Sequence, residues 1–404
     1  MIFKCPNCNG ALKFDATTNK MICEYCMSYF SPEQIGANLD EEKVLNQEQI
    51  EHVEDDSITT DIGNTEDYME CNIYRCTSCG GELMVDGLES STFCAYCGQP
   101  TIVFDRVSKE MRPKYIVPFS VSKTQAVEAI RERLNKGLFV PEEIKNFQMD
   151  RIRGIYIPYW LCDVDYEDRM SLRGTVGSGK NEQTRYYYRW AKTSFTNMTL
   201  DASYRLNDET SQRLEPFNTN ELKEFNVSYM SGYYADRYDV EAQQIKTVAA
   251  ERAKDLFEDE VIRTVKADNV KILKNMPTCS VKDTKYVLLP AWFLTFHYAG
   301  EPYTFLVNGQ TRKVVGCVPY EKKYIVPLIV ILSACFSAVA AFLMFVVLLS
   351  GEVDDDSIKI ITMIVIGGFA AMGAGIKKFE RLKQGVELTK SKVMMKFVKE
   401  RQEE

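Results

Sequence analysis

Histidine is scarce in this chain of 404 residues, which contains two histidines, His52 and His297. Two histidines so far apart give little material for a multi-histidine metal site or a His-based catalytic triad. The chain also lacks a basic excess, since its net charge is −8 and its pI is near 5.2. General binding to phosphate backbones needs a concentrated Lys/Arg surface, so any nucleic-acid role must be local. Residues 1–5 begin no apolar run, and we expect no signal peptide.

Cysteine is abundant by contrast, and eight of the thirteen cysteines fall in four C-x-x-C pairs. The spacing C-x2-C-x14-C-x2-C occurs twice. Its members are Cys5, Cys8, Cys23 and Cys26 in the first copy, and Cys76, Cys79, Cys94 and Cys97 in the second. Each pair puts two thiolates on one tight turn, and a hairpin between the pairs brings the second turn opposite the first. The pattern predicts two zinc ribbons.

Both zinc ions are predicted to be structural. Four protein thiolates fill a tetrahedral shell and leave no position for water or substrate. Units this small have almost no core, so metal binding, worth on the order of 10 kcal/mol in model fingers, is expected to supply most of their folding free energy. Disulfide pairing is the alternative, and a reducing cytoplasm disfavours it. The other cysteines lack partners at metal spacing and are expected to be packing or surface thiols: Cys71, Cys162, Cys279, Cys317 and Cys335.

The chain is expected to be multi-domain, beginning with these two small β ribbons. Residues 1–32 form the first ribbon and residues 71–104 the second, as two copies of one unit. Residues 33–70 are predicted to be a flexible acidic linker. Within it, residues 40–70 hold twelve carboxylates against Lys43 alone, so the segment cannot bury enough apolar surface to offset its ordering entropy.

Residues 113–320 are predicted to form an α+β cytosolic region. One helix begins at Ser122, which has capping-box spacing to Gln125, and ends at Gly137. A longer amphipathic helix follows Asp239. The region therefore alternates helical and strand-like patterns.

Strand-like runs follow both helices, at residues 155–161 and 287–294, and each run carries Pro-x-Trp. The shared order of helix and strand has two explanations, an internal duplication or coincidence, and the sequence favours neither. Further on, Asn308-Gly309 separates two β-rich runs and predicts a hairpin, because both residues tolerate positive φ.

The last quarter of the sequence is predicted to be a transmembrane hairpin. Residues 324–350 are uncharged and exceed the roughly 20 residues needed to cross a bilayer. Residues 358–376 form the second predicted span, and lysines flank the pair while its connecting loop is acidic. The positive-inside rule therefore predicts a multi-pass cell-membrane protein with both termini in the cytoplasm. The basic tail, 377–404, is expected to lie on anionic lipid or bind a partner helix, or else only to fix orientation.

Residues 174–180 match the first part of a phosphate-binding loop, G-x4-G-K. The following Asn181 is not the Ser or Thr that ligates magnesium, and residues 184–190 predict a strand where the loop requires a helix. A glycine-rich hairpin is therefore favoured. Four residues of that strand are candidates for stacking on single-stranded bases, although cross-strand packing is favoured: Arg185, Tyr187, Arg189 and Trp190.

The chain resembles a bacterial family of membrane proteins identified as TFIIB-type zinc ribbon-containing or primosomal-protein-N′-like. Besides the ribbons, the matching segments are 118–119, 154–160, 214–217, 229–236, 285–292 and 308–311. The helicase label depends on the ribbons alone, because no intact nucleotide loop followed by a helix is present. The resemblance implies a membrane-anchored protein whose partners are phage-shock-type or flotillin-like membrane proteins, with no catalytic residues to carry over.

These features predict a scaffold or adaptor that recruits protein partners at the cytoplasmic face of the membrane, and not an enzyme. Neither ribbon has a basic patch, since the first sets Lys4, Lys13 and Lys20 against Asp15 and Glu24. The alternative is a membrane-tethered nucleic-acid binder that uses its ribbons. Its signature would be steeply salt-dependent binding of DNA or RNA.

Overall fold

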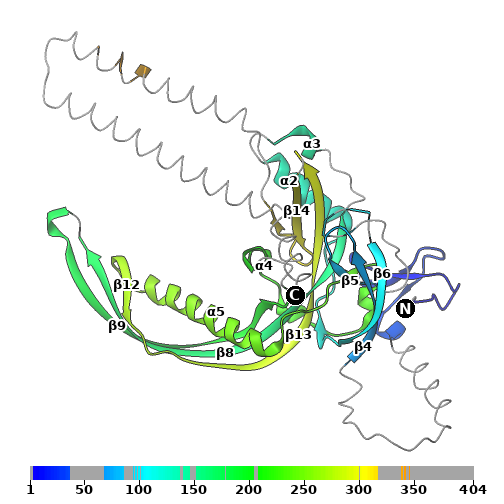
Figure 1. Cartoon of the computed structure of the whole chain (residues 1–404), viewed down its shortest axis with the longest axis horizontal. Helices are drawn as coiled ribbons and strands as arrows, with labels where there is room; N and C mark the ends of the chain where they lie inside the picture. Colours follow the sequence, from blue (N-terminus) through cyan, green and yellow to red (C-terminus); the bar gives the residue numbers. More distant parts are fainter. Residues whose placement is uncertain are drawn as a thin grey trace, which may run out of the picture.

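Figure 1 shows the computed structural model of the chain. It describes residues 3–36, 68–85, 94, 96–97, 99–100, 102–136, 140–145, 152–177, 179–203, 208–299 and 301–316, and also 338–339, 341–342 and 345. The described part is mainly β, with one small sheet near the N-terminus and one large sheet.

The small sheet belongs to the first ribbon. Its strands are β1 (Leu12–Asp15), β2 (Lys20–Cys23) and β3 (Tyr29–Phe30), in the order β1-β2-β3. The turn between β1 and β2 is held by Asp15, whose carboxylate accepts hydrogen bonds from the backbone N–H groups of Thr17 and Thr18 at 3.2 Å. Asn19 completes the turn at φ 54°, a conformation that asparagine tolerates better than most residues.

The large sheet has twelve strands, and its main path runs β10-β7-β13-β8-β11-β5-β4-β6. The bounds are β4 (Tyr68–Cys76), β5 (Glu82–Val85), β6 (Ile102–Met111), β7 (Tyr115–Ile116), β8 (Arg153–Val176), β9 (Gln183–Asp201), β10 (Lys223–Glu224), β11 (Tyr234–Ala235), β12 (Asp268–Lys274), β13 (Thr278–Tyr298), β14 (Glu301–Asn308) and β15 (Val314–Val315). Strands of the second ribbon, β4 and β5, thus lie in the same sheet as the central strands β8 and β13.

The helices are α2 (Lys123–Asn135), α3 (Glu142–Lys145), α4 (Asp208–Leu214) and α5 (Ala242–Arg263), with short 3₁₀ turns η3 (Gly179–Asn181), η4 (Thr219–Glu221) and η5 (Val227–Met230). The predicted capping box is confirmed: Ser122 accepts from Gln125 N–H, and the Gln125 side chain accepts from Ser122 N–H. The described helix ends at Asn135, close to the predicted stop.

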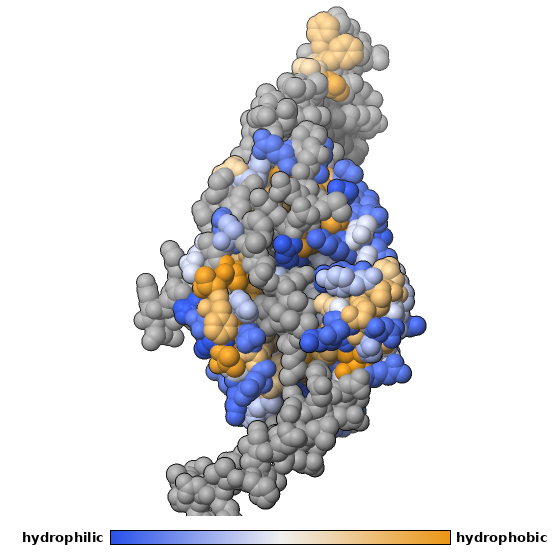
Figure 2. Space-filling view, turned by 90° about the vertical axis from the view of Figure 1, so that its right-hand side faces the viewer, coloured by the Kyte–Doolittle hydropathy of each residue, from blue (hydrophilic) through white to orange (hydrophobic). Residues whose placement is uncertain are grey.

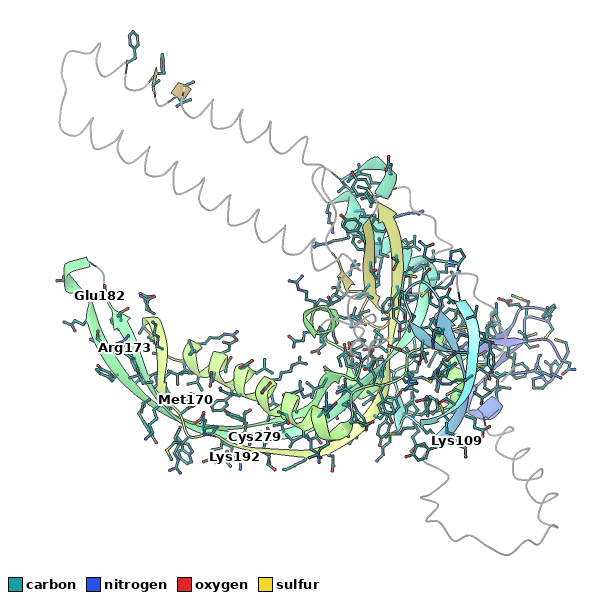
Figure 3. The ribbon with its side chains drawn as sticks, viewed as in Figure 1. Lys109, Met170, Arg173, Glu182, Lys192 and Cys279 are labelled. Atoms are coloured by element: carbon teal, nitrogen blue, oxygen red, sulfur yellow. The ribbon has the colours of Figure 1, made fainter. Side chains whose placement is uncertain are left out.

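A long curved arm extends from the body of the molecule (Figure 1). Strands β8 and β9 form its antiparallel hairpin, and α5 lies along one face, where Phe257 packs against Tyr166 with ring centroids 4.9 Å apart. Figure 3 labels Glu182 and Arg173 toward its tip and Lys192 further back. The other face is open to solvent, so alternate residues of β9 are exposed. This period of two is the pattern of a strand with one covered face.

The strands that follow the two helices are related by internal symmetry. In the antiparallel pairing of β8 with β13, Ile157 lies opposite Leu289, and the prolines Pro158 and Pro290 each follow one residue later. A two-fold rotation through the Ile157–Leu289 pair therefore superimposes the two Pro-x-Trp segments.

The symmetry extends to the helices, because each tryptophan binds the start of the helix from the other half. Trp160 Nε1 donates to Val240 O just before α5, and Trp292 Nε1 donates to Val121 O just before α2, both at 2.8 Å. Equivalent backbone hydrogen bonds accompany them: Ala202 N to Pro158 O and Val240 N to Ala202 O, and Gly309 N to Pro290 O and Val121 N to Gly309 O. The two-fold symmetry of the strands therefore includes the residues that precede both helices.

The predicted hairpin after residue 303 is confirmed, with a different turn. Strands β14 and β15 pair antiparallel, but the loop is longer than Asn308-Gly309. The Asn308 side chain accepts from the N–H groups of Gln310 and Thr311 at 2.9 and 2.8 Å, and Arg312 takes the left-handed conformation at φ 63°.

The predicted membrane-spanning architecture is wrong. No helix among the residues the structure describes is long and apolar enough to cross a bilayer. The longest, α5, has 22 residues but is amphipathic and carries charges along its exposed side. The fold class with a transmembrane hairpin and the multi-pass membrane localisation are corrected accordingly. Apart from residues 338–339, 341–342 and 345, the predicted spans 324–350 and 358–376 and the tail 377–404 lie outside the described residues.

The predicted acidic linker, 33–70, also lies mostly outside the described residues. Its two ends are described: residues 32–36 form a helical turn and residues 68–70 begin β4.

Candidate metal centres

The first candidate centre brings together the four cysteines of the first ribbon: Cys5, Cys8, Cys23 and Cys26. Their sulfur atoms all lie within 4.8 Å of one another. The Sγ atoms of Cys5 and Cys26 are 3.5 Å apart, and those of Cys8 and Cys23 are 3.4 Å apart. These separations are far longer than the roughly 2.05 Å of a disulfide bond.

The second candidate centre repeats this arrangement with the cysteines of the second ribbon: Cys76, Cys79, Cys94 and Cys97. The Sγ atoms of Cys76 and Cys97 are 3.6 Å apart, and those of Cys79 and Cys94 are 3.7 Å apart. A tetrahedron with metal–sulfur bonds of about 2.3 Å has edges of about 3.8 Å. Both clusters therefore have the donor set and the size to bind a metal ion such as zinc.

The backbone explains why the cysteines converge. We call each C-x-x-C turn a knuckle. In the first knuckle of each ribbon, the N–H of the leading cysteine donates to a glycine carbonyl: Cys5 to Gly10 at 2.7 Å and Cys76 to Gly81 at 2.8 Å. The residue after the second cysteine is left-handed in both cases, Asn9 at φ 61° and Gly80 at φ 69°. The two ribbons therefore share one local fold.

The electrostatics of the first cluster favour a bound cation. The N–H of Gly10 lowers the pKa of Cys8, yet the thiols of Cys26 and Cys23 together raise it to about 12. The Ser28 hydroxyl and N–H lower the pKa of Cys26 to about 6. Four sulfurs this close cannot all be ionised without a positive charge among them, and a divalent ion removes that conflict.

The second cluster shows the same conflict between neighbouring thiols. Cys76 does most to raise the pKa of Cys94 above its ordinary value, followed by Cys79, and desolvation adds to the shift. The pKa of Cys79 is raised too, again chiefly by Cys76. A bound cation would reverse these directions by stabilising the thiolates.

The two centres differ in their access to solvent. In the first ribbon Cys5 and Cys23 are buried, while Cys8 and Cys26 are exposed. In the second ribbon all four cysteines are buried, and the most accessible, Cys79, is 8% exposed. Solvent and chelators can therefore reach the first centre directly, whereas protein atoms cover the second centre.

One segment of the central region, residues 229–236, holds both ribbons. Ser231 Oγ donates to Leu12 O at 2.8 Å, Phe14 N donates to Ser231 O at 3.1 Å, and the Phe14 and Tyr229 rings meet edge to face at 5.2 Å. Gly232 faces the Lys13 side chain at φ 88°, a conformation that L side chains rarely adopt. These contacts fix the first ribbon to the body.

The same segment then pairs with the second ribbon. Tyr234 and Ala235 form β11, which lies antiparallel to β5, opposite Val85 and Met84. Arg237 follows, and its guanidinium lies 3.2 Å from Glu82 at the start of β5. Corresponding strands of the two ribbons thus bind neighbouring stretches of one segment.

The second ribbon has one further attachment, at its second knuckle. Tyr96 packs edge to face against Phe293 of β13, with ring centroids 5.7 Å apart. Thr295 Oγ1 donates to Tyr96 O at 2.7 Å. This contact joins residues 199 positions apart in the chain, so sequence spacing gives no sign of it.

Sequence patterns missed the bridging role of residues 229–236. The segment forms part of the family resemblance, and its one available signal was a glycine among aromatic residues. That signal predicts an unusual backbone but does not say what the aromatic rings contact.

The loop that resembles a phosphate-binding motif is a hairpin, as predicted. Gly177 and Gly179 have φ of 97° and 61°, and β9 follows where a nucleotide loop would require a helix. The four stacking candidates do not share one face of β9, because Arg185, Tyr187 and Arg189 alternate along the strand and Trp190 directly follows Arg189. Arg189 points toward α5 and donates to Thr264, and Tyr187 is half-buried on that side, whereas Trp190 faces solvent.

The fold and the two clusters define a β-rich protein with two four-cysteine centres compatible with zinc ribbons. No family model matches the chain, so the TFIIB-type family is not confirmed, and no solved structure matches it. A relative is "Uncharacterized protein YdjG" of Bacillus subtilis (strain 168), 27% identical over 334 residues, which cover 79% of this chain and 90% of YdjG. The similarity extends well beyond the ribbons but names no activity.

Proposed function

We propose that the protein is a zinc-ribbon adaptor that binds other proteins and does not catalyse a reaction. In this proposal zinc is the ion of both centres, and the ribbons are of the TFIIB type. The observation that carries the proposal is the set of four cysteine sulfurs in each cluster. Four thiolates satisfy tetrahedral zinc completely, which suits a structural ion and gives a substrate no place to coordinate.

The surface of the first ribbon supports a protein partner. Three large apolar or aromatic side chains are exposed beside its cysteine cluster: Tyr25, Met27 and Tyr29. The positive charge of Lys13 is offset by Glu24, whose carboxylate lies 3.3 Å from its ammonium group. Hydrophobic side chains also reach the surface among hydrophilic ones on the side of the molecule that carries the first ribbon and β6 (Figures 1 and 2). Exposed apolar patches with few free charges are typical of protein contacts.

The adaptor proposal is tested with full-length protein loaded with zinc. Wild type is compared with Cys8→Ser/Cys26→Ser, which removes two ligands of the first centre. Reproducible partners from a cell extract should be retained by wild type and lost by the variant, while circular dichroism shows that the large sheet persists. Failure of wild type to retain any protein, or equal retention by the variant, would contradict the proposal.

A second candidate function, binding of single-stranded nucleic acid, is favoured by one observation on the arm. Tyr186, Tyr188 and Trp190 lie on the open face of β9 and are 73%, 63% and 63% exposed. The neighbouring strand contributes Arg173 opposite Tyr186, and Arg169 lies 5.8 Å from the Trp190 ring centroid. Exposed rings beside guanidinium groups can stack with bases and contact phosphates.

This second function has a direct optical test. The chain has three tryptophans, and Trp160 and Trp292 are buried, so Trp190 supplies the solvent-sensitive fluorescence. Base stacking would quench that emission on titration with oligothymidylate, and salt would weaken the effect steeply. Quenching should be weaker in Tyr186→Ala/Tyr188→Ala, and its absence in wild type would exclude this face as the binding site.

A further inference from the structure

The second knuckles of the two ribbons are alike in structure but differ in what covers them. Tyr25 and Tyr96 occupy equivalent positions, between the last two cysteines of each ribbon. A Cβ added at Gly10 would lie 2.6 Å from Tyr25 Cδ2, and one added at Gly81 would lie 2.9 Å from Tyr96 Cδ2. Both rings therefore lie over the equivalent glycine and project from the ribbon in the same way.

The surroundings of the two rings are opposite. Tyr96 is 7% exposed because β13 covers it, whereas Tyr25 is 79% exposed. Met27 and Tyr29, which follow the same knuckle of the first ribbon, are 60% and 48% exposed. Solvent exposure of these apolar side chains is unfavourable, and burial against a partner would recover part of that free energy.

The covered knuckle shows what kind of surface fits. Phe293 and Thr295 are two residues apart in β13, so they project from the same face of the strand. The phenyl ring meets the tyrosine edge to face, and the threonine hydroxyl donates to the tyrosine carbonyl at 2.7 Å. The recognition unit is thus one strand face with an aromatic residue followed two positions later by a hydroxyl.

We propose that the second knuckle of the first ribbon, together with the residues that follow it up to Tyr29, is the docking site for a β-strand of a partner protein. That strand presents an aromatic residue and, two positions later, Ser or Thr. The inference depends on the proposed adaptor function and specifies its partner. In this arrangement the second knuckle of the second ribbon packs against β13 of its own chain. The equivalent knuckle of the first ribbon binds another protein. Tyr25 is the central contact, because it matches the ring that is buried in the internal complex.

The test places a photo-crosslinking residue, benzoylphenylalanine, at position 25 of the full-length protein. Tyr68 is the control position, since it is an exposed tyrosine of β4, at 54%, outside both proposed binding surfaces. Irradiation in cells should link position 25 to a partner strand with the expected aromatic-x-hydroxyl pattern, mapped by mass spectrometry. Adducts with a second copy of this chain, with its own C-terminal segment or with nucleic acid would overturn the proposal.

Affinity measurements with the purified partner complete the test. Tyr25→Ala should raise the dissociation constant by about tenfold or more, as expected for an aromatic residue at the centre of an interface. Tyr25→Phe, which keeps the ring, and Tyr68→Ala should leave the dissociation constant within about twofold of wild type. If Tyr25→Ala binds as wild type while Cys8→Ser/Cys26→Ser does not, the adaptor stands and the docking site is wrong. If neither change affects binding, both proposals fail.

Discussion

The two ribbons share a metal-binding frame but sit differently in the molecule. Each has the same cysteine spacing, the same backbone hydrogen bonds at its first knuckle and the same tyrosine over a glycine. The second ribbon is part of the large sheet and is covered at its second knuckle, whereas the first keeps a separate sheet and an open knuckle. Local cysteine spacing therefore sets the frame of each ribbon, and the residues packed around the frame set its role.

The largest expected effect comes from removing one ligand from each centre. Cys94→Ser should lose one zinc ion and leave the protein mostly unfolded, because structural zinc contributes on the order of 10 kcal/mol and whole domains are stable by about 5–15 kcal/mol. Cys8→Ser should lose one zinc ion while the large sheet still unfolds cooperatively. Metal analysis and thermal unfolding by circular dichroism measure both. Equal destabilisation by the two changes would show that the two centres contribute alike to the stability of the large sheet.

The equivalent tyrosines provide the next contrast. Tyr96→Ala removes a buried aromatic ring and should cost about 3–5 kcal/mol of unfolding free energy. Tyr25→Ala removes an exposed ring and should change stability by no more than about 0.5 kcal/mol. Denaturant unfolding of the zinc-loaded proteins checks this pair. A stability loss for Tyr25→Ala as large as that for Tyr96→Ala would show that the first knuckle is already covered.

The two centres should lose their metal ions to a chelator at different rates. A chelating dye can approach Cys8 and Cys26 directly, but it reaches the second centre after local unfolding. We expect two kinetic phases of equal amplitude, with the first faster by about tenfold or more. Cys8→Ser should show the slow phase alone, and a single phase in wild type would mean that burial does not protect the second zinc ion.

The smallest effect concerns the attachment of the first ribbon at acidic pH. The Ser31 hydroxyl, and then the Tyr229 hydroxyl 2.6 Å away, hold the pKa of Glu33 below its usual 4.5. A lowered pKa means that the contact stabilises the fold above the unfolded-state pKa and is lost as pH falls through the folded-state value.

Glu33→Gln should therefore remove stability at neutral pH, and the loss should shrink as the pH falls below 4.5, the usual pKa of a glutamate. Because Glu33 is exposed, solvent screening limits the effect to less than about 1 kcal/mol. Unfolding is measured for both proteins in the same buffers, so that thiolate protonation affects them alike. A difference that grows as the pH falls would contradict the assigned contact.

Features set by neighbours in the sequence were predicted well. The cysteine spacing predicted both clusters, and Ser122 with Gln125 predicted the start of α2, because each depends on a few adjacent residues. The length of β8 was underestimated. Apart from the buried Asp168, residues 163–173 alternate polar and apolar side chains, which is the period of an arm strand with one face covered by α5.

The contacts that distinguish the ribbons could not be predicted in this way. Ser231 reaches Leu12 across 219 positions, and Thr295 reaches Tyr96 across 199. Composition alone also misled: long apolar runs predicted spans, whereas no helix among the described residues is long and apolar enough to cross a bilayer. Long-range packing has no fixed spacing, so it leaves no periodic signal in one sequence.

The most direct test of the account is zinc X-ray absorption spectroscopy combined with metal analysis of the full-length protein. We predict two zinc ions per chain, each with four sulfur neighbours at about 2.3 Å and no nitrogen or oxygen ligand. A folded protein that contains no metal, or zinc with an oxygen ligand from water, would contradict the claim that both centres are closed and structural.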